Sequence, residues 1–146
     1  MTMFDAYQET LKTYKPLALA AERRLLRGAK NGSRKCAEEL ILRHVGFVIF
    51  RLRRKLSPAL LRRYGEELLS DTIPILYQKI NTYRLDYQDA QGRFRPVRFS
   101  SYIWKRIDGF IIDALRQDWA RGQPRWHIAS WAAHSSSPDS SHPDPR

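Results

Sequence analysis

The sequence is poor in cysteine and has no long apolar run. Cys36 is the single cysteine among 146 residues, which excludes an internal disulfide framework and a cysteine-rich zinc cluster and fits a reducing compartment. No apolar run reaches the roughly 18 residues that a membrane span requires. The N-terminal residues are polar and lack the apolar stretch of a secretory signal. We therefore expect a soluble cytoplasmic protein without a membrane partner.

Sequence motifs of the common catalytic sites are also missing. The chain has neither a GxxxxGK[ST] phosphate loop nor an HExxH zinc helix. His44 lies beside an apolar stripe, and the other three histidines fall in the last twenty residues, where they are too loosely placed for a metal site. The adjacent pairs Glu38-Glu39 and Glu66-Glu67 point about 100° apart on a helix and cannot converge on one bond. We expect no enzyme, no metal and no cofactor.

Glycine is scarce, with seven residues, and apolar positions recur at helical rather than alternating spacing. The fold class predicted is all-α, without strand pairs or repeats. Asn31-Gly32-Ser33 ends one helix and starts the next, with Gly32 as the stop and Ser33 as the N-cap. Pro74 lies inside an apolar pattern, so we expect a kink or a restart there. The helices expected cover residues 16–30, 34–56, 58–63, 66–83 and 98–116, with an exposed loop over residues 86–96.

In the helix expected over residues 34–56, five apolar side chains follow the spacing of one buried helix face. They are Ile41, Val45, Val48, Leu52 and Leu56. After Trp126 the composition changes, because the last twenty residues hold six serines, three prolines and three histidines. Such a stretch buries too little surface to offset its chain entropy. We expect an N-terminal arm (1–15), a compact helical domain (16–119) and a disordered tail (120–146).

Basic residues dominate the charge, giving a net +11 and a pI near 10.2. This balance favours a polyanionic partner such as nucleic acid. Residues 22–63 hold thirteen Lys/Arg against three acids, and a solvated helix face is the simplest interpretation. Residues 92–125 hold eight against three, interleaved with aromatic rings. Cations beside flat rings suit single-stranded nucleic acid; the alternative is that these rings form the core and the cations solvate the helix.

Two stretches carry a family resemblance. EELLSDTIPILYQKINTYR (66–84) resembles, without a gap, the polymerase-binding segment of region 2 in bacterial sigma factors of the sigma-70 family. RFSSYIWKRIDGFIIDALRQDW (98–119) resembles the promoter-melting helix of that region, most closely in flagellar and sporulation-type members. The segment over residues 38–56 is similar to the preceding helix of region 2. The resemblance covers residues 35–119 and implies a compact helical bundle of the sigma region 2 type.

The resemblance implies two contact surfaces. In the family, one helix docks on a coiled coil of the largest subunit of core RNA polymerase. The corresponding polar residues here are Glu66, Glu67, Ser70, Asp71 and Gln78. These residues meet basic groups across such an interface, unless they only cap and solvate their helix.

The second surface contacts the single-stranded −10 region of promoter DNA. Tyr102 matches the ring that stacks near a flipped base, and Lys105 and Arg106 are placed for phosphates. For Tyr102 the alternative is a core tyrosine. The full set of DNA-binding candidates is Arg98, Phe99, Tyr102, Trp104, Lys105, Arg106 and Arg116. Arg93 and Arg95 extend this basic track.

The sequence also departs from the family pattern. Lys105 stands where housekeeping members carry an aromatic ring, Asp108 replaces a commonly basic position and would repel phosphate, and Pro74 replaces an aliphatic residue. No helix-turn-helix for the −35 element follows. We expect a sigma-like initiation factor at the bacterial nucleoid, with a second protein supplying −35 contacts, or an anti-sigma factor, as further partner. The alternatives are a regulator that competes with sigma factors for core polymerase without activating, and a basic helical DNA-binding protein that ignores polymerase.

Overall fold

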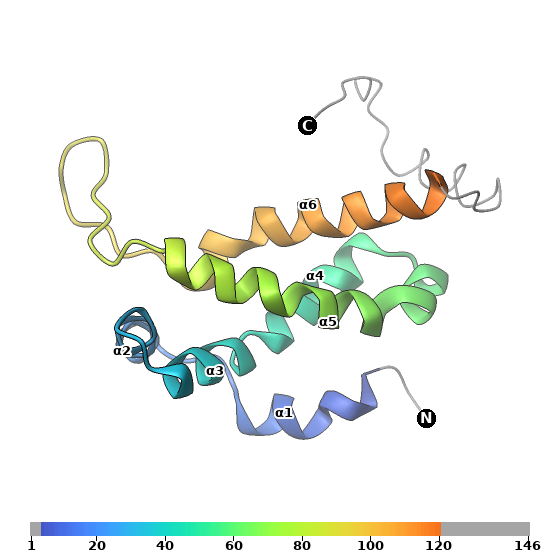
Figure 1. Ribbon diagram of the computed structural model, residues 1–146, viewed down its shortest axis with the longest axis horizontal. Helices are drawn as coiled ribbons and strands as arrows, with labels where there is room; N and C mark the ends of the chain where they lie inside the picture. The colour runs from blue at the N-terminus through green and yellow to red at the C-terminus, as the bar shows by residue number, and fades with distance from the viewer. Residues whose placement is uncertain (1–3, 121–146) are drawn as a thin grey trace. The chain divides into compact units, whose positions relative to one another are not determined.

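The computed structural model describes residues 4–120, and side chains as far as residue 117. Its elements are a 3-10 turn (Asp5–Tyr7), α1 (Gln8–Thr13), α2 (Leu19–Lys30), α3 (Arg34–Leu42), α4 (Val45–Lys55), α5 (Pro58–Thr82) and α6 (Phe99–Ala120) (Figure 1). The described residues contain no strand, so the all-α prediction is confirmed. One isolated antiparallel bridge, between Gln88 and Phe94, closes the loop before α6. None of the helices over these residues has the length and apolarity to cross a membrane.

The chain divides after Ile111, so that α6 contributes its first part to one unit and the residues from Ile112 to a second. The predicted tail, residues 120–146, lies outside the described residues apart from the last residue of α6. The predicted N-terminal arm contains the 3-10 turn and α1.

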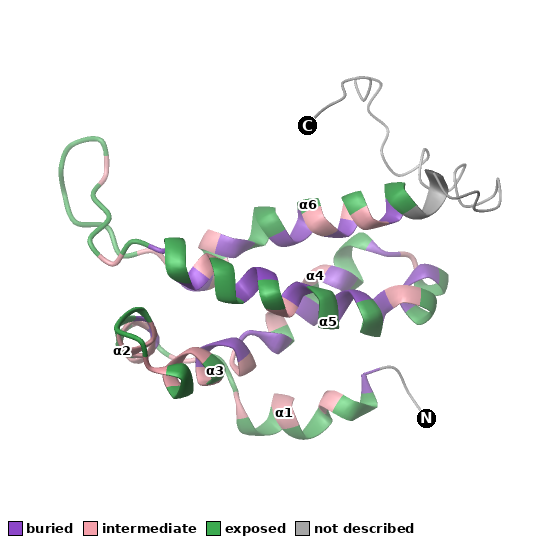
Figure 2. Ribbon diagram, in the orientation of Figure 1, coloured by how far each residue is buried: buried purple, intermediate pink, exposed green. Residues whose placement is uncertain are grey.

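The core of the first unit forms where the apolar faces of the helices meet. α4 packs against α5, and α2 packs against both α3 and α5. All five residues of the predicted apolar stripe are buried, as are Phe99, Ile103 and Ile107 on α6 (Figure 2). Burial of side chains of this size is worth about 1.5–3 kcal/mol each, which is why the amphipathic pattern fixes the inward faces.

The junction between α2 and α3 has the predicted chemistry. Gly32 adopts a φ of 98°, which favours glycine, and the Ser33 hydroxyl accepts a hydrogen bond from the Cys36 amide at 3.1 Å. The two helices approach closely at Gly28, where an added Cβ would lie 2.5 Å from the Cys36 Sγ atom. Glycine at position 28 therefore sets the distance between α2 and α3.

The prediction of one helix over residues 34–56 is wrong. The segment is two helices, because the chain turns at Arg43 and His44. The His44 amide donates to the Ile41 carbonyl, a bond one residue shorter than in an α-helix, and the ring Nδ1 donates to the Leu40 carbonyl at 2.8 Å. These bonds use the carbonyls that would continue the helix and bring the His44 ring into the core.

The expected break between residues 63 and 66 is also wrong. Of the kink or restart expected at Pro74, the restart is wrong. α5 is one continuous helix of 25 residues, which begins at Pro58, and the Ser57 side chain caps it by accepting from the Leu60 amide. The close packing around position 65 favours glycine there, because an added Cβ would lie 3.2 Å from both Leu61 and Phe4. Pro74 is exposed, so its ring projects to solvent. A proline at position 74 cannot donate to the Ser70 carbonyl, and Ser70 is exposed as well, so this carbonyl is on the solvent side of the helix.

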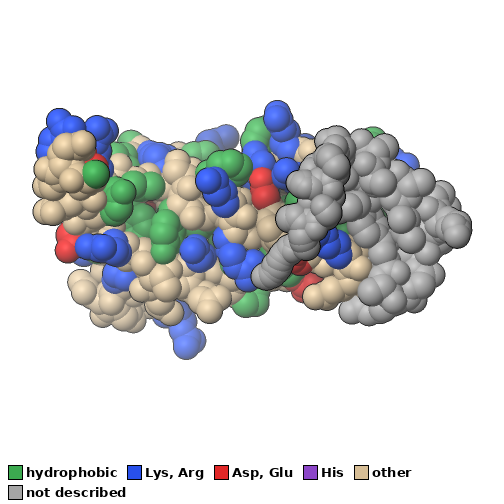
Figure 3. All heavy atoms as spheres, turned by 90° about the horizontal axis from the view of Figure 1, so that it is seen from above, with side chains coloured by type: hydrophobic (Ala, Val, Ile, Leu, Met, Phe, Trp, Pro, Cys, Tyr) green, Lys and Arg blue, Asp and Glu red, His purple; other side chains and the backbone are tan. Residues whose placement is uncertain are grey.

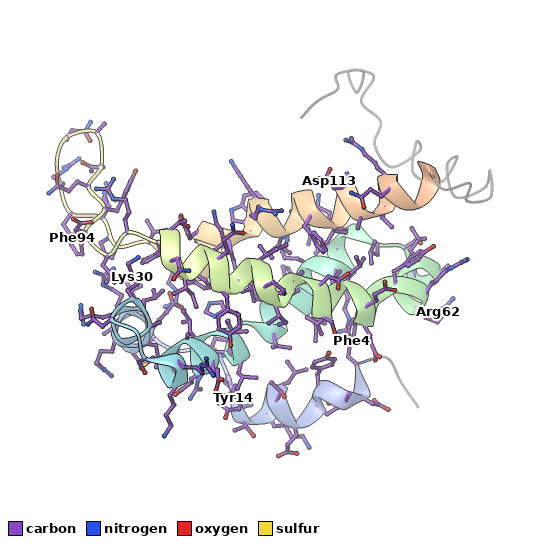
Figure 4. The ribbon with its side chains drawn as sticks, in the orientation of Figure 1. Phe4, Tyr14, Lys30, Arg62, Phe94 and Asp113 are labelled. Carbon is purple, nitrogen blue, oxygen red and sulfur yellow. The ribbon has the colours of Figure 1, made fainter. Side chains whose placement is uncertain are left out.

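Phe4 anchors the N-terminal segment to the helices. Its side chain is buried next to Gly65, and its amide donates to Glu66 Oε2 at 2.7 Å (Figure 4). The guanidinium of Arg53 lies 5.6 Å from the centre of the Phe4 ring. One of the predicted polymerase-binding residues, Glu66, is therefore engaged by the chain's own N-terminal segment.

Replacing each of two helical glycines by alanine should change the free energy of unfolding in opposite directions. Gly109 is exposed in α6, and an added Cβ would meet nothing within 4 Å. We expect G109A to raise the free energy of unfolding by about 1 kcal/mol, because alanine is the better helix former. We expect G28A to lower it by about 1–3 kcal/mol, because its methyl would overlap Cys36. Urea denaturation followed by circular dichroism measures both.

The double variant G28A/C36A is the control for the cause. Removing the Cys36 sulfur removes the closest contact, so much of the loss should be recovered relative to C36A alone. A loss in G28A that is the same with and without Cys36 would contradict this interpretation.

Candidate nucleic-acid interface

The first turn of α6 is fixed by a buried carboxylate. Glu22, on α2, is 2% exposed, and its Oε2 accepts a hydrogen bond from the Phe99 amide at 2.7 Å. A negative charge at a helix N-terminus, where amides lack helical partners, is stabilising. Glu22 Oε1 lies 3.6 Å from Arg98 Nη2 and 3.7 Å from His44 Nε2. α2 therefore determines where α6 begins.

Phe99 is a core residue. Its ring is fully buried and packs edge-to-face on His44, with centroids 5.0 Å apart. Tyr83 lies 6.1 Å away on its other side. The ring is not presented at the surface, so among the DNA-binding candidates Phe99 serves to position the helix. Arg98 is half-buried and donates to the Leu17 carbonyl at 2.7 Å.

Tyr102 lies between α6 and the end of α5. It is half-buried, its hydroxyl is hydrogen-bonded to the Thr82 hydroxyl at 2.7 Å, and its ring meets Tyr83 edge-to-face. Lys79 Nζ lies 4.4 Å from the ring centroid, which is a cation–π distance. The tyrosine thus packs inward in part, as the core alternative expects, and stacking of a base near its ring stays a prediction.

Trp104 lies on the opposite flank of α6, facing α4. It is 39% exposed, with the Arg51 guanidinium 5.3 Å and Lys105 Nζ 5.7 Å from its ring. Lys105 and Arg106 are exposed. The site thus holds an exposed indole with two cations within 6 Å of its ring, and such a combination is suited to a base and its phosphate.

Asp108 does not act as a free negative charge. It is 8% exposed and accepts from Arg51 in a two-bond pair, with Nε to Oδ1 at 2.9 Å. Lys55 Nζ lies 3.9 Å from Oδ2. The hydrogen bond that Arg51 donates to Asp108 raises the pKa of Arg51. The expected repulsion of phosphate at this position is offset by two cations of α4, which the sequence analysis had placed on a plain solvated face.

The loop between α5 and α6 presents a second ring beside cations. Phe94 is 55% exposed, and the Arg23 guanidinium lies 5.1 Å from its centroid (Figure 4). Asp89 organises the loop: Oδ1 accepts from the amides of Gln91 and Arg93 at 2.9 Å each, and Oδ2 lies 3.1 Å from Arg95 Nε. The hydrogen bond from the Arg93 amide holds the pKa of Asp89 below its usual value.

Figure 3 views the molecule from above Figure 1, where basic and hydrophobic side chains are scattered over the part that is not grey and acidic ones are fewer. Arg116, the last DNA-binding candidate, is exposed in the second unit. The basic partners that sequence reasoning missed are Arg23, Arg51 and Lys79. They belong to α2, α4 and α5, and the sequence around each of them does not indicate which aromatic ring it contacts.

The predicted polymerase-binding residues share one exposed face of α5. Glu67, Ser70, Asp71 and Gln78 are exposed, and the buried residues of the same helix, such as Leu69 and Leu76, lie on its other side. The exposed Tyr77 adds a ring to this face. The face is thus acidic and polar, whereas the α6 side is basic.

Within the described residues, no three His, Cys, Asp or Glu side chains are grouped so as to hold a metal ion. Comparisons of the chain with protein-family models, curated proteins and solved structures find no match.

The loop should lose order in acid. The pKa of Asp89 is lower in the folded protein than in the unfolded chain, where it is near 4, so the ionised carboxylate stabilises the loop. This stabilisation is complete above the pKa of the unfolded chain and is lost as the pH falls through the pKa of the folded protein. We expect amide exchange at Gln91 and Arg93 to rise below about pH 4, beyond its intrinsic pH dependence. Hydrogen-exchange NMR from pH 7 to 2.5 measures it.

D89N is the matched control, since its amide oxygen still accepts hydrogen bonds but does not titrate. Its loop protection should be independent of pH over this range. An equal acid-induced loss in D89N would show that another group is responsible.

Proposed function

We propose that the chain is a sigma-like transcription initiation factor. In this proposal the exposed face of α5 binds the largest subunit of core RNA polymerase. The surface formed by α6 and the preceding loop contacts the non-template strand of the promoter −10 element. A second protein supplies the −35 contacts.

The observation that carries the proposal is the pairing of exposed rings with cations on one side of the first unit. Arg51 and Lys105 both lie within 6 Å of the Trp104 ring, and Arg23 lies over the Phe94 ring. Stacking on one ring is worth about 1–3 kcal/mol per base, and it requires a base that is out of the duplex stack. Single-stranded DNA therefore fits this surface better than a closed duplex, whose bases are stacked.

The polymerase part of the proposal is supported by the acidic face of α5. Asp71 and Glu67 are exposed on a helix whose other face is fully used in the core, so nothing within the described residues covers them. Charged rims of this kind steer and orient a partner of opposite charge. The same sequence segment carries the resemblance to the polymerase-binding helix.

A competitor of sigma factors is the second candidate. Lys105, at the position where housekeeping sigma factors carry an aromatic ring, is an exposed cation and leaves Trp104 as the exposed ring of this helix face. Such a protein would occupy core polymerase and lower transcription by another sigma factor. In vitro transcription from a set of promoters with different −10 elements, with and without the chain, separates activation from competition.

Charge reversal on α5 tests polymerase binding. We expect the purified chain to co-migrate with core polymerase on a sizing column and D71R to lose this binding by at least about tenfold, because a cation would face the basic partner surface. E9R is the matched control, since Glu9 is an exposed acid on α1. Equal losses in both variants, or no binding by the unaltered chain, would contradict the polymerase part.

Removing the exposed indole tests DNA binding. We expect W104A to weaken binding of a single-stranded −10 oligonucleotide by about tenfold, within the range for loss of one stacked base. K105Q should reduce the slope of log affinity against log salt by about 0.7, the value for one phosphate contact on a single strand. Fluorescence anisotropy at four salt concentrations measures both effects.

Y77A is the control, because Tyr77 is an exposed ring on the α5 face rather than on the α6 side. Its DNA affinity should equal that of the unaltered chain. If W104A and Y77A bind DNA equally well, Trp104 is not a stacking platform. Intact DNA binding without any polymerase affinity would instead support a generic DNA-binding protein.

A further inference from the structure

A cavity of about 320 Å³ lies in the first unit, beneath α1. Its walls come from α1 and the segment after it, from the α3–α4 junction and from the start of α6. Volumes of this order are at the lower end of those that hold small molecules. The apolar wall consists of Leu11, Tyr14, Leu17, Leu40, Phe47 and Phe50.

Two buried polar side chains, Glu22 and His44, also line the cavity. They are 2% and 6% exposed, and Glu22 Oε1 lies 3.7 Å from His44 Nε2. Among the described residues neither atom has a partner within hydrogen-bond distance, whereas Glu22 Oε2 is satisfied by the Phe99 amide. Neither atom is among the fully enclosed polar atoms that lack a hydrogen bond, so both are accessible to a donor that enters the cavity.

The chemistry of this pair is set by the other ring nitrogen. His44 Nδ1 faces the Leu40 carbonyl at 2.8 Å, and because a carbonyl only accepts, Nδ1 carries the proton. Burial lowers the pKa of His44, so the neutral ring presents the lone pair of Nε2 to the cavity. Two acceptors thus lie 3.7 Å apart, and one amino group on the cavity side of the pair can donate an N–H to each of them.

The charges around the cavity are already balanced. Arg43 pairs with Glu39 at 2.9 Å, and Arg98 lies 3.6 Å from Glu22 while donating to the Leu17 carbonyl. An added ammonium would therefore meet two arginines, whereas a neutral amino group would not be repelled. The apolar wall, with three aromatic rings, suits a flat apolar body.

We propose that this cavity is a binding site for a small neutral heteroaromatic amine, whose amino group donates to Glu22 Oε1 and His44 Nε2 and whose ring lies against Leu40, Phe47 and Phe50. The proposal assigns a ligand class to a site outside the surface of exposed rings and cations.

The test compares two molecules of the same shape, 3-aminoquinoline and 3-methylquinoline, titrated into the full chain at pH 7.5. The readouts are amide chemical shifts and the His44 side-chain nitrogen shifts by NMR. We expect the amine to bind at least about tenfold more tightly than the methyl compound, because it alone donates to both acceptors. The His44 Nε2 resonance should shift with the amine.

Two variants keep the test specific. In E22Q the amide oxygen can still accept from Phe99 while its amino group donates to His44, so the preference for the amine should fall below about threefold. L11W fills the cavity from α1 and should abolish binding of both molecules. Circular dichroism checks that each variant remains folded.

Several outcomes would overturn the proposal. Equal affinity for the two quinolines would mean an apolar cavity without recognition of an amine. No binding of either would mean that the acceptors are met by a bridging water only. Binding that survives in L11W, or an amine preference that survives in E22Q, would place the site elsewhere.

Discussion

The placement of α6 depends on one buried carboxylate. Glu22 is surrounded by the first amide of α6, by Arg98 and by His44, so α2 and the α3–α4 junction meet the start of α6 at this point. A buried charge of this kind is tolerated only when its surroundings compensate the lost hydration. With its first turn fixed, α6 places Asp108 against Arg51 on one flank and Tyr102 against Thr82 on the other. Lys105 and Gly109 then project outward.

The inward faces of the helices could be predicted from the sequence, but their ends only in part. Burial follows from spacing, and the stripe from Ile41 to Leu56 is buried throughout. The turn at His44 was missed because it depends on bonds from the His44 amide and ring to the Ile41 and Leu40 carbonyls, and the spacing of apolar residues does not distinguish such a turn from a continuous helix. Pro74 was over-weighted, since a proline on an exposed face costs one hydrogen bond without a clash in the core.

Composition indicated where the candidate surface lies, but not how its side chains are used. The rings and cations of residues 92–116 were visible as a cluster, and both Trp104 and Phe94 are exposed. Phe99 could not be separated from them by type, because an aromatic at helical spacing fits core and surface alike. The partner of Asp108, Arg51, lies 57 residues earlier on another helix, so its role required the tertiary structure.

The bond between Glu22 and Phe99 also bears on the order in which the protein is made and folds. The two residues are 77 positions apart, so at synthesis rates of about 5–20 residues per second Glu22 precedes its partner by about 4–15 s. The α2–α3 and α4–α5 pairs are local in sequence and form without this delay. Until α6 emerges, the Glu22 carboxylate remains hydrated. Burial of Glu22 in the core is therefore a late step of folding, which occurs only after about the first hundred residues have been synthesised.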